Sequence, residues 1–496
     1  ETACNFVGNG EAQPAAGRVV SNIGFVETFK ERETIYAWDL GNECNCMETI
    51  PDRFSAASWT AFISNAIHAA DPSRPVVSGM SGMTLDGNWR IQDQARLTDL
   101  LTTHPYPLFN KQASMDEMLS LRTSMFATTL TKWYIDLGNK PCLVEEIGTT
   151  GPMICGDEQA AAYLRLNLFS VWANGSTGLL WWCNHDQNLL NSFPYTIHIM
   201  ERELGLLTSK NEPKPALIEM KKFADFLESN PINLPKARED GVCLLTRAQD
   251  HWSVSYMTHI LAKSIGLNLK FSYACEGELP DANLYIMPSV NSWVYMYKNT
   301  FEALQQKVFN GADLYISYGN AHIQDFEEFV GLKVIDSCIC GQKLSVDMDG
   351  KVCSFHQPAA RRLTPTTATV LYADSNGNPF ITVNKYGKGR VFFVAAPIES
   401  ALAEIHNGFD GTVEKIYQTI FKDHIDATPV SVQAKDVVFT LHPTSDGAYL
   451  VAINHSGTAK PLNLDLKGNY EIENVLYGDE ETIKPYDACI LKLKSL

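Results

Sequence analysis

The sequence predicts an α/β protein in three parts: parallel β/α units of a barrel, a second α/β domain and a small antiparallel β-sandwich. Three observations predict this fold class. Up to residue 229, short apolar runs alternate with helical patterns, which is typical of parallel β/α units. A second series of short apolar strands with helices between them begins at Gly241. From Pro429 onward, short alternating segments are separated by turn signals such as Ser445-Asp446-Gly447.

Buried strands are expected in the first part at 35–40, 74–79, 99–107, 143–148 and 178–182. Helices are expected at 19–30, 56–70, 114–137 and 158–173. We expect the third helix to open with a capping box formed by Ser114 and Glu117 and to close at Gly138. Strands and helices therefore alternate at a spacing that suits a β/α barrel.

Two glutamates follow apolar runs about one hundred residues apart. Glu43 ends the segment Trp38-Asp39-Leu40-Gly41-Asn42-Glu43, and Glu146 lies in Leu143-Val144-Glu145-Glu146-Ile147-Gly148. Each is expected at the carboxyl end of a strand, where a barrel enzyme keeps its chemistry. Hydrolysis of a glycosidic bond with retention needs such a pair, one carboxylic acid to protonate the leaving oxygen and one carboxylate to attack the anomeric carbon.

The two segments resemble the glycoside hydrolases of clan A, particularly family 5, of the β-mannanase, β-mannosidase and cellulase type. The resemblance implies a (β/α)8 TIM barrel. Glu43, in the Asn-Glu dipeptide, would be the acid/base at the end of the fourth strand, and Glu146 would be the nucleophile at the end of the seventh. Glu145 is expected on the alternate face of the strand, pointing into packing.

The resemblance also implies further residues that bind the substrate. His104 and Tyr106 would point toward the glutamates, and Asn42 would hold the 2-hydroxyl of the sugar. A tryptophan at the end of the last strand would stack on the sugar. The alternation of side chains along the strand does not decide between Trp181 and Trp182, and we favour Trp182. For this chemistry we expect a raised pKa for Glu43 and an ionised Glu146.

If Glu43 ends the fourth strand, only about forty residues precede it, whereas three β/α units need roughly ninety. Barrel strands one to three are therefore expected to be lacking in this chain. The arginine that supports the nucleophile near the second strand of family 5 enzymes has no assigned counterpart, and Glu1 begins no recognisable signal peptide.

The later parts resemble the trailing domains of family 42 β-galactosidases. The segment from Glu201 to Leu206, with Lys214-Pro215-Ala216, resembles the end of their barrel. We expect a partial TIM-barrel catalytic domain at 1–229, a flavodoxin-like domain at 239–427 and a β-sandwich at 428–496. The flavodoxin-like domain would be related to glutamine amidotransferases without being catalytic, and would form either a homo-oligomer or one wall of the substrate cleft.

Cys338-Ile339-Cys340-Gly341-Gln342 superficially resembles a glutaminase nucleophile, but the glycine before the cysteine is missing. Residues 343–346 alternate like a strand instead. The pairs Cys44-x-Cys46 and Cys338-x-Cys340 are too closely spaced for ready pairing within each pair.

The composition excludes several classes of protein. The net charge is −17 with no basic stripe, which argues against nucleic-acid binding. No long uncharged apolar run predicts a membrane span. The twelve cysteines form no zinc signature, so no metal or cofactor is expected, and their scatter favours a reducing compartment such as the cytoplasm while leaving a secreted or periplasmic location open.

The sequence therefore predicts a retaining β-glycoside hydrolase that acts by double displacement on β-mannosides or β-glucosides, in a β-linked oligosaccharide or polysaccharide. Two alternatives stay open: an exo-acting glycosidase of β-galactosidase type, and an inactive fragment that serves in carbohydrate binding or assembly. Endo or exo action cannot be read from this chain.

Overall fold

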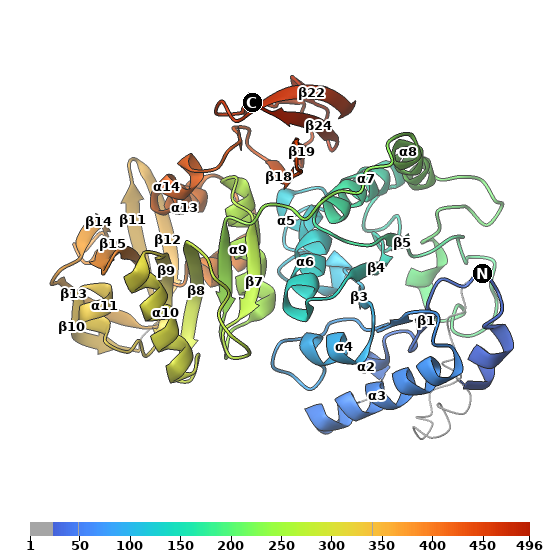
Figure 1. Cartoon of the computed structure of the whole chain (residues 1–496), viewed down its shortest axis with the longest axis horizontal. Helices are drawn as coiled ribbons and strands as arrows, with labels where there is room; N and C mark the ends of the chain where they lie inside the picture. The colour runs from blue at the N-terminus through green and yellow to red at the C-terminus, as the bar shows by residue number, and fades with distance from the viewer. Residues whose placement is uncertain (1–22, 48, 340) are drawn as a thin grey trace. The chain divides into compact units, whose positions relative to one another are not determined.

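The computed structural model describes residues 23–496 except residues 48 and 340, so the start of the helix expected at 19–30 lies outside the described residues. The chain divides into two compact units. The first comprises the chain up to Phe109 together with 126–229, and the second comprises 110–125 together with 230–496. Figure 1 shows the helices and strands of both, coloured along the chain.

Parallel strands form the centre of the first unit, as predicted. They are β1 (Trp38–Asp39), β2 (Val76–Val77), β3 (Leu101–Thr103), β4 (Cys142–Ile147) and β5 (Leu179–Trp181). β1 pairs with β2, β3 pairs with β4, and β4 pairs with β5, all in parallel. A parallel bridge between Val77 and Leu100 joins the two sets, so the strands follow one another in chain order.

Helices provide the crossover connections that parallel strands need. They are α2 (Cys44–Met47), α3 (Arg53–Ala70), α4 (Ile91–Leu97), α6 (Phe126–Gly138), α7 (Asp157–Ala173) and α8 (Pro215–Ser229), with short 3-10 helices η1 (Pro107–Phe109) and η2 (Ile199–Arg202). Asp52 caps α3 by accepting a hydrogen bond from the Ser55 amide at 2.7 Å. The α/β class of this unit is confirmed.

The helix predicted at 114–137 begins later than expected. The described structure has turns after Ser114, a short helix α5 (Leu121–Ser124), and then α6. The capping box of Ser114 and Glu117 is wrong, because Ser120 caps α5 and accepts a hydrogen bond from the Thr123 amide at 3.2 Å.

Tertiary contacts explain this difference. Arg122 of α5 is fully buried in the second unit, where its guanidinium donates to the carbonyl oxygens of Leu402 at 3.0 Å and Ala403 at 3.1 Å. It also forms a 2.9 Å ion pair with Asp116. A local helix signal is weak compared with a buried guanidinium that has several partners.

A seven-stranded sheet organises the second unit in the order β14-β15-β16-β9-β8-β6-β7. The strands are β6 (Gly241–Leu245), β7 (Leu269–Tyr273), β8 (Leu284–Ser292), β9 (Asp313–Ala321), β14 (Thr369–Ala373), β15 (Pro379–Tyr386) and β16 (Gly389–Val394). β7, β6, β8, β9 and β16 are parallel, in the 2-1-3-4-5 order that is common in doubly wound sheets. β14 and β15 are antiparallel additions.

The helices of the second unit, besides α5, are α9 (His251–Ser264), α10 (Lys298–Asn310), α11 (Phe326–Val330), α12 (Ile398–Ala403), α13 (Thr412–Ile420) and α14 (Lys422–Asp426). β15 and β16 pair antiparallel and form a hairpin. Gly387 in its turn has φ of 61°, and a Cβ there would lie 2.4 Å from the carbonyl oxygen of Phe309. Glycine is therefore required at this position.

Two further antiparallel pairs lie between β9 and β14. They pair β10 (Leu332–Cys338) with β13 (Ala360–Pro365) and β11 (Gln342–Met348) with β12 (Lys351–Gln357). The strand predicted at 343–346 is thus confirmed within β11. Cys338 is disulfide-bonded, whereas nine other cysteines in the described ranges are free.

The C-terminal part is antiparallel, as predicted. β18 (Val437–Pro443), β19 (Gly447–Asn454), β24 (Ala488–Ser495) and β22 (Tyr470–Tyr477) form a sheet in that order. Short pairs join β17 (Ser431–Val432) to β21 (Leu464–Asp465) and β20 (Lys460–Pro461) to β23 (Thr482–Ile483). Buried side chains that include Val437, Leu450 and Leu491 form its core.

Among the helices that the structure describes, none has the length and apolar character to cross a bilayer.

Glu399 of α12 is a fully buried carboxylate in the second unit. It accepts hydrogen bonds from the hydroxyls of Tyr315 at 2.7 Å, Tyr417 at 2.8 Å and Ser289 at 2.8 Å, and from Ser317. These hydroxyls come from β8, β9 and α13, so the carboxylate ties the sheet to two helices.

We predict that Glu399→Leu lowers the free energy of unfolding of this unit by about 3 kcal/mol or more, because it leaves several buried hydroxyls without an acceptor. Urea denaturation followed by tryptophan fluorescence measures the change. The control Glu302→Leu removes an exposed carboxylate of α10 and should cost at most about 0.5 kcal/mol. Equal effects of the two substitutions would contradict the structural role of Glu399.

Candidate active site

The candidate residues converge at the carboxyl ends of the parallel strands of the first unit. Glu43 follows β1, His104 and Tyr106 follow β3, and Glu146 lies near the end of β4. One polar atom from each of Glu43, His104 and Glu146 lies within 4.8 Å of the others. The sequence patterns had placed these side chains at one edge, and the structure brings them into contact.

The turn after β1 fixes Glu43. Its backbone has φ of 47°, a conformation that is rare outside glycine, and its amide donates to the carbonyl oxygen of Gly79 at 2.7 Å. Asp39 supports this turn by accepting from the Gly41 amide at 3.0 Å. A Cβ on Gly79 would lie 2.0 Å from the Asp39 carboxylate, so the close approach requires glycine. Strain of this kind is typical of functional sites.

His104 lies between carboxylates. Its side chain has no exposed surface, and Nδ1 lies 2.8 Å from Oε1 of Glu43. Nε2 lies 3.2 Å from Oε2 of Glu145. The same Nδ1 is 3.8 Å from Oε2 of Glu146. A single buried imidazole therefore links the two candidate catalytic glutamates to a third one.

Tyr106 holds Glu146 directly. Its hydroxyl donates to Oε2 of Glu146 at 3.0 Å. Gly148 makes room for this arrangement, since a Cβ there would lie 3.5 Å from the Tyr106 ring and 3.0 Å from the carbonyl oxygen of Trp182. The glycine two residues after Glu146 therefore has a steric function.

The expectation that Glu145 points into packing is wrong. Between β4 and β5 the register shifts, because Val144 pairs with Leu179 and Ile147 pairs with Trp181. β4 thus has one residue more than β5 across this interval, which is a bulge that breaks the alternation of side chains. Both Glu145 and Glu146 consequently reach His104.

The carboxylates around His104 raise its pKa. Burial is the largest single influence and acts to lower it, but hydrogen bonds to Glu145 and Glu43 and the charge of Glu146 outweigh burial and raise the pKa to about 10. His104 is therefore an imidazolium at neutral pH.

The pKa shifts of Glu43 and Glu146 do not follow the expectation of a raised pKa for Glu43. The hydrogen bond from His104 is the largest influence on Glu43 and lowers its pKa. Burial is the largest influence on Glu146 and raises its pKa, with His104 and Tyr106 acting against it. The expected raised pKa of Glu43 is wrong because a buried positive charge faces it, which the sequence did not reveal.

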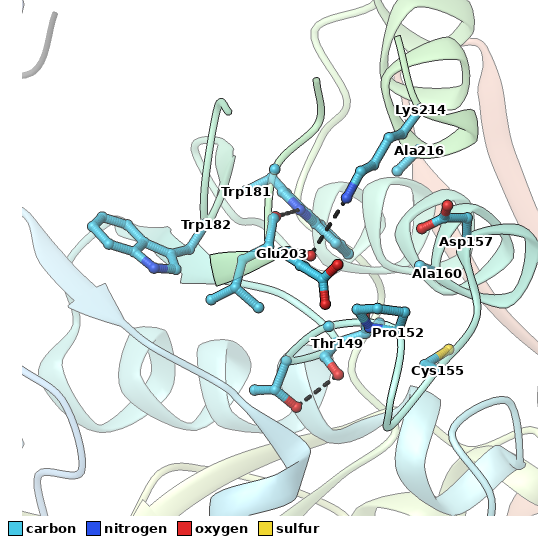
Figure 2. A pocket seen from close by; sticks show the side chains of 14 residues that line it. Thr149, Pro152, Cys155, Asp157, Ala160, Trp181, Trp182, Glu203, Lys214 and Ala216 are labelled. Carbon is cyan, nitrogen blue, oxygen red and sulfur yellow. Dashed lines mark hydrogen bonds between the residues drawn. The ribbon is translucent and has the colours of Figure 1, made fainter. Parts of the chain in front are cut away.

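Trp181 and Trp182 point to different sides. Trp181 packs against Leu164, Leu168 and Ala216 and donates to the carbonyl oxygen of Leu204 at 3.1 Å. Figure 2 shows the Trp182 indole directed away from the helix that carries Ala160. Trp182 donates to Oε2 of Glu201 at 3.0 Å, and its peptide bond to Cys183 is cis.

Asn42 is partly exposed directly before Glu43, and its side chain makes no hydrogen bond within the described part of the chain. Two residues of the site were missed by the sequence reasoning, Glu145 and Glu201. The doubled glutamate was a visible signal for Glu145, but no pattern marked Glu201 as a partner of Trp182.

Glu43, His104 and Glu146 are close enough together to hold a cation. Both ring nitrogens of His104 already face carboxylates, however, so we assign no ion to this cluster.

No protein-family model matches the chain. A curated relative, the β-galactosidase LacA of Lactobacillus acidophilus, is 26% identical over 166 residues, which are 32% of this chain and 22% of that protein. The chain thus spans about a fifth of the length of the curated relatives that it matches.

Solved structures are similar over most of the chain. The exo-β-1,4-mannosidase Op5Man5 from Opitutaceae bacterium strain TAV5 has a TM-score of 0.67 at 19% identity, covering 85% of this chain and 79% of that one. A catalytic mutant of Gan42B, a GH42 β-galactosidase from G. stearothermophilus, has 0.68 at 14% identity, covering 97% and 81%. The β-galactosidase from Rahnella sp. R3 has 0.70 at 11% identity, covering 97% and 81%.

These likenesses show an α/β fold similar to that of TIM-barrel glycoside hydrolases, followed by a β-rich C-terminal region. The proteins named in these comparisons are glycosidases, and the likeness of the solved structures concerns the fold.

We predict that His104 gives the protein a pH-dependent stability. Since its pKa in the folded state is about 10 against an ordinary value of 6.5, its stabilising contribution is complete below pH 6.5 and is lost as the pH rises to about 10. The difference in free energy of unfolding between the parent and His104→Gln should therefore shrink over this interval. Urea titrations at several pH values measure it, and a difference that stays constant or grows would contradict the assigned charge.

Proposed function

We propose that this protein is a retaining β-glycoside hydrolase in which Glu146 is the nucleophile and Glu43 is the acid/base. The observation that supports this most is the distance between the two side chains, since carboxylate oxygens of Glu43 and Glu146 lie within 4.8 Å. Retaining enzymes need about 5–5.5 Å between their carboxyl groups, whereas inverting enzymes need about 6.5–9.5 Å to admit a water molecule.

In the first step, Glu146 attacks the anomeric carbon to form a glycosyl-enzyme while Glu43 protonates the leaving oxygen. The hydrogen bond from Tyr106 orients the attacking carboxylate and opposes the effect of burial on its pKa. In the second step, Glu43 accepts a proton from water, which releases the sugar with its configuration retained.

The remaining site residues would bind the sugar. Asn42 precedes the acid/base with its amide open to a ligand, which suits a hydrogen bond to the 2-hydroxyl. Trp182 offers an aromatic face for stacking, with its indole held by Glu201. His104 and Tyr106 hold the two carboxylates and complete the wall of the site.

β-Mannosides or β-glucosides are the proposed substrates, carried by a β-linked oligosaccharide or polysaccharide. The likeness to an exo-β-1,4-mannosidase supports the first of these. The β-galactosidases among the similar proteins make β-galactosides the alternative. Neither nucleic acid nor a membrane is proposed as a partner, because the net charge is −17 without a basic stripe.

The second unit is proposed to comprise the flavodoxin-like domain at 239–427, supported by its 2-1-3-4-5 strand order, and the β-sandwich at 428–496. Formation of a homo-oligomer through the flavodoxin-like domain remains part of this proposal.

We predict that the parent hydrolyses one of three aryl glycosides (β-mannoside, β-glucoside or β-galactoside), and that Glu146→Ala lowers kcat by about 10⁴-fold or more. Azide should partly restore turnover of the variant and give a glycosyl azide of inverted anomeric configuration, because it attacks where the nucleophile is missing. Rates and product configuration are measured by absorbance and NMR.

The matched control for this experiment is Glu158→Ala, at an exposed position in the first turn of α7, which should keep the rate of the parent. No turnover of any of the three sugars by the folded parent would count against the proposed activity and favour a carbohydrate-binding role.

We predict that Tyr106→Phe shifts the acidic limb of the kcat/KM profile to higher pH. The Tyr106 hydrogen bond lowers the pKa of Glu146, so its loss raises that pKa, and the ionised nucleophile is then lost sooner as the pH falls. At about pH 5 the loss should be roughly tenfold or more, and smaller at neutral pH. Tyr372→Phe, which removes a partly exposed hydroxyl of the second unit that donates to Asp349 at 2.9 Å, is the control. A loss that is equal at every pH would contradict this role of Tyr106.

A further inference from the structure

The position of Glu145 is not explained by a two-carboxylate mechanism. It lies on the bulge of β4, its side chain is 15% exposed, and its Oε2 faces Nε2 of His104 at 3.2 Å. Glu43 faces the other ring nitrogen at 2.8 Å. The three side chains thus form a line of carboxylate, imidazole and carboxylate.

The chemistry of these groups fixes where protons can be. An ionised carboxylate only accepts hydrogen bonds, so each ring nitrogen that faces one must carry a hydrogen. His104 therefore holds two N–H groups while Glu43 and Glu145 are both ionised. When the proton on Nδ1 passes to Glu43, the protonated Glu43 becomes the donor to that nitrogen, while the Nε2–H of His104 still donates to the carboxylate of Glu145.

We propose that Glu145 is a positioning residue that keeps the hydrogen on Nε2 of His104, so that Nδ1 stores the proton that Glu43 delivers to the leaving group. This inference rests on the proposed function of Glu43. It accounts for a site in which the acid/base faces a buried imidazolium before the reaction and is itself ionised. A carboxylate that holds an imidazole in one tautomer is a known device for directing proton transfer.

In glycosylation, the Nδ1–H bond of His104 breaks with its electron pair left on nitrogen, and the proton passes through Glu43 to the glycosidic oxygen. The bond from the anomeric carbon to that oxygen breaks, and a bond to Glu146 forms. In deglycosylation, water attacks the anomeric carbon, the bond to Glu146 breaks, and the proton of water returns through Glu43 to Nδ1.

Glu146 couples to the same proton. Its Oε2 lies 3.8 Å from Nδ1, close enough for its negative charge to favour the imidazolium. Formation of the glycosyl-enzyme removes that charge at the moment when Nδ1 gives up its proton. One positive and one negative charge therefore disappear together, and the net charge of the buried cluster stays constant through both steps.

The charged and titratable groups around this line are few within the described residues. His104 faces Glu43, Glu145 and Glu146. Glu43 also accepts from Ser81 and lies near Cys46, and Tyr106 and Glu201 lie on the side of Glu146. Of the described groups that contact His104, Glu43 and Glu146 make or break bonds in the two steps, and Glu145 does not.

The first test reads the imidazole of His104 without any turnover. Two-bond ¹H–¹⁵N spectra of the full chain, with the His104 signals assigned by their loss in His104→Gln, report its charge and tautomer between about pH 6 and 11. The parent should keep both N–H groups up to about pH 9 and lose one of them around a midpoint of about 10. In Glu145→Gln, which preserves shape without charge, the midpoint should fall by at least about one pH unit. An unchanged midpoint and tautomer would overturn the proposal.

The second test separates proton delivery from structural damage. Glu145→Gln should lower kcat/KM about 100-fold for phenyl glycosides, whose leaving group needs protonation, and at most about threefold for 2,4-dinitrophenyl glycosides, which need none. The alkaline limb for phenyl glycosides should move to lower pH. Losses that are equal for both leaving groups at every pH would indicate a merely structural role and overturn the proposal.

Two variants keep the tests decisive. Glu145→Asp restores the charge with a shorter reach and should recover part of both effects. If Glu145→Gln does not fold, the same measurements are made on Glu145→Asp. A His104 midpoint and kcat/KM values equal to those of the parent would then overturn the proposal. Glu158→Gln is the matched control and should behave as the parent. If the parent hydrolyses no glycoside but the His104 titration still depends on Glu145, the proposed function fails while the control of His104 by Glu145 stands.

Discussion

A buried imidazolium held among carboxylates is the interaction on which the site depends. His104 has no exposed side-chain surface, and its charge persists there only because Glu43, Glu145 and Glu146 surround it. Burial of an unpaired charge would be prohibitive, whereas a charge with hydrogen-bonded partners is tolerated. The same interaction keeps Glu43 ionised, places Glu43 close to Glu146, and sets the electrostatics of the reaction that we propose.

The backbone is shaped to permit this cluster. The positive φ of Glu43 and the close approach of Gly79 to Asp39 position the first carboxylate, while the bulge in β4 turns two consecutive glutamates toward one histidine. Both features depart from regular strand geometry at the carboxyl ends of parallel strands. Functional sites are where such departures are expected, since the surrounding regular structure can support their strain.

Much of this arrangement could be predicted from the sequence because it follows from strand ends. Apolar runs located the strands that carry His104, Tyr106 and Glu146, and parallel topology places such ends at one edge. The bulge that redirects Glu145 could not be predicted, since it is a property of pairing between β4 and β5. The expected helix start at Ser114 failed because burial of Arg122 overrode a local capping signal. The lowered pKa of Glu43 could not be predicted either, because it depends on a hydrogen bond from His104, which lies far from Glu43 in the sequence.

In the proposed mechanism Glu146, rather than its neighbour Glu145, forms a covalent bond to the sugar. Incubation of the protein with 2-deoxy-2-fluoro glycosyl fluorides of mannose, glucose and galactose slows release of the intermediate, so that it accumulates and can be located by peptide mass spectrometry. We expect one equivalent of fluorosugar on the side chain of Glu146. Attachment to Glu145, or hydrolysis of the natural bond with inversion and without any adduct, would contradict it.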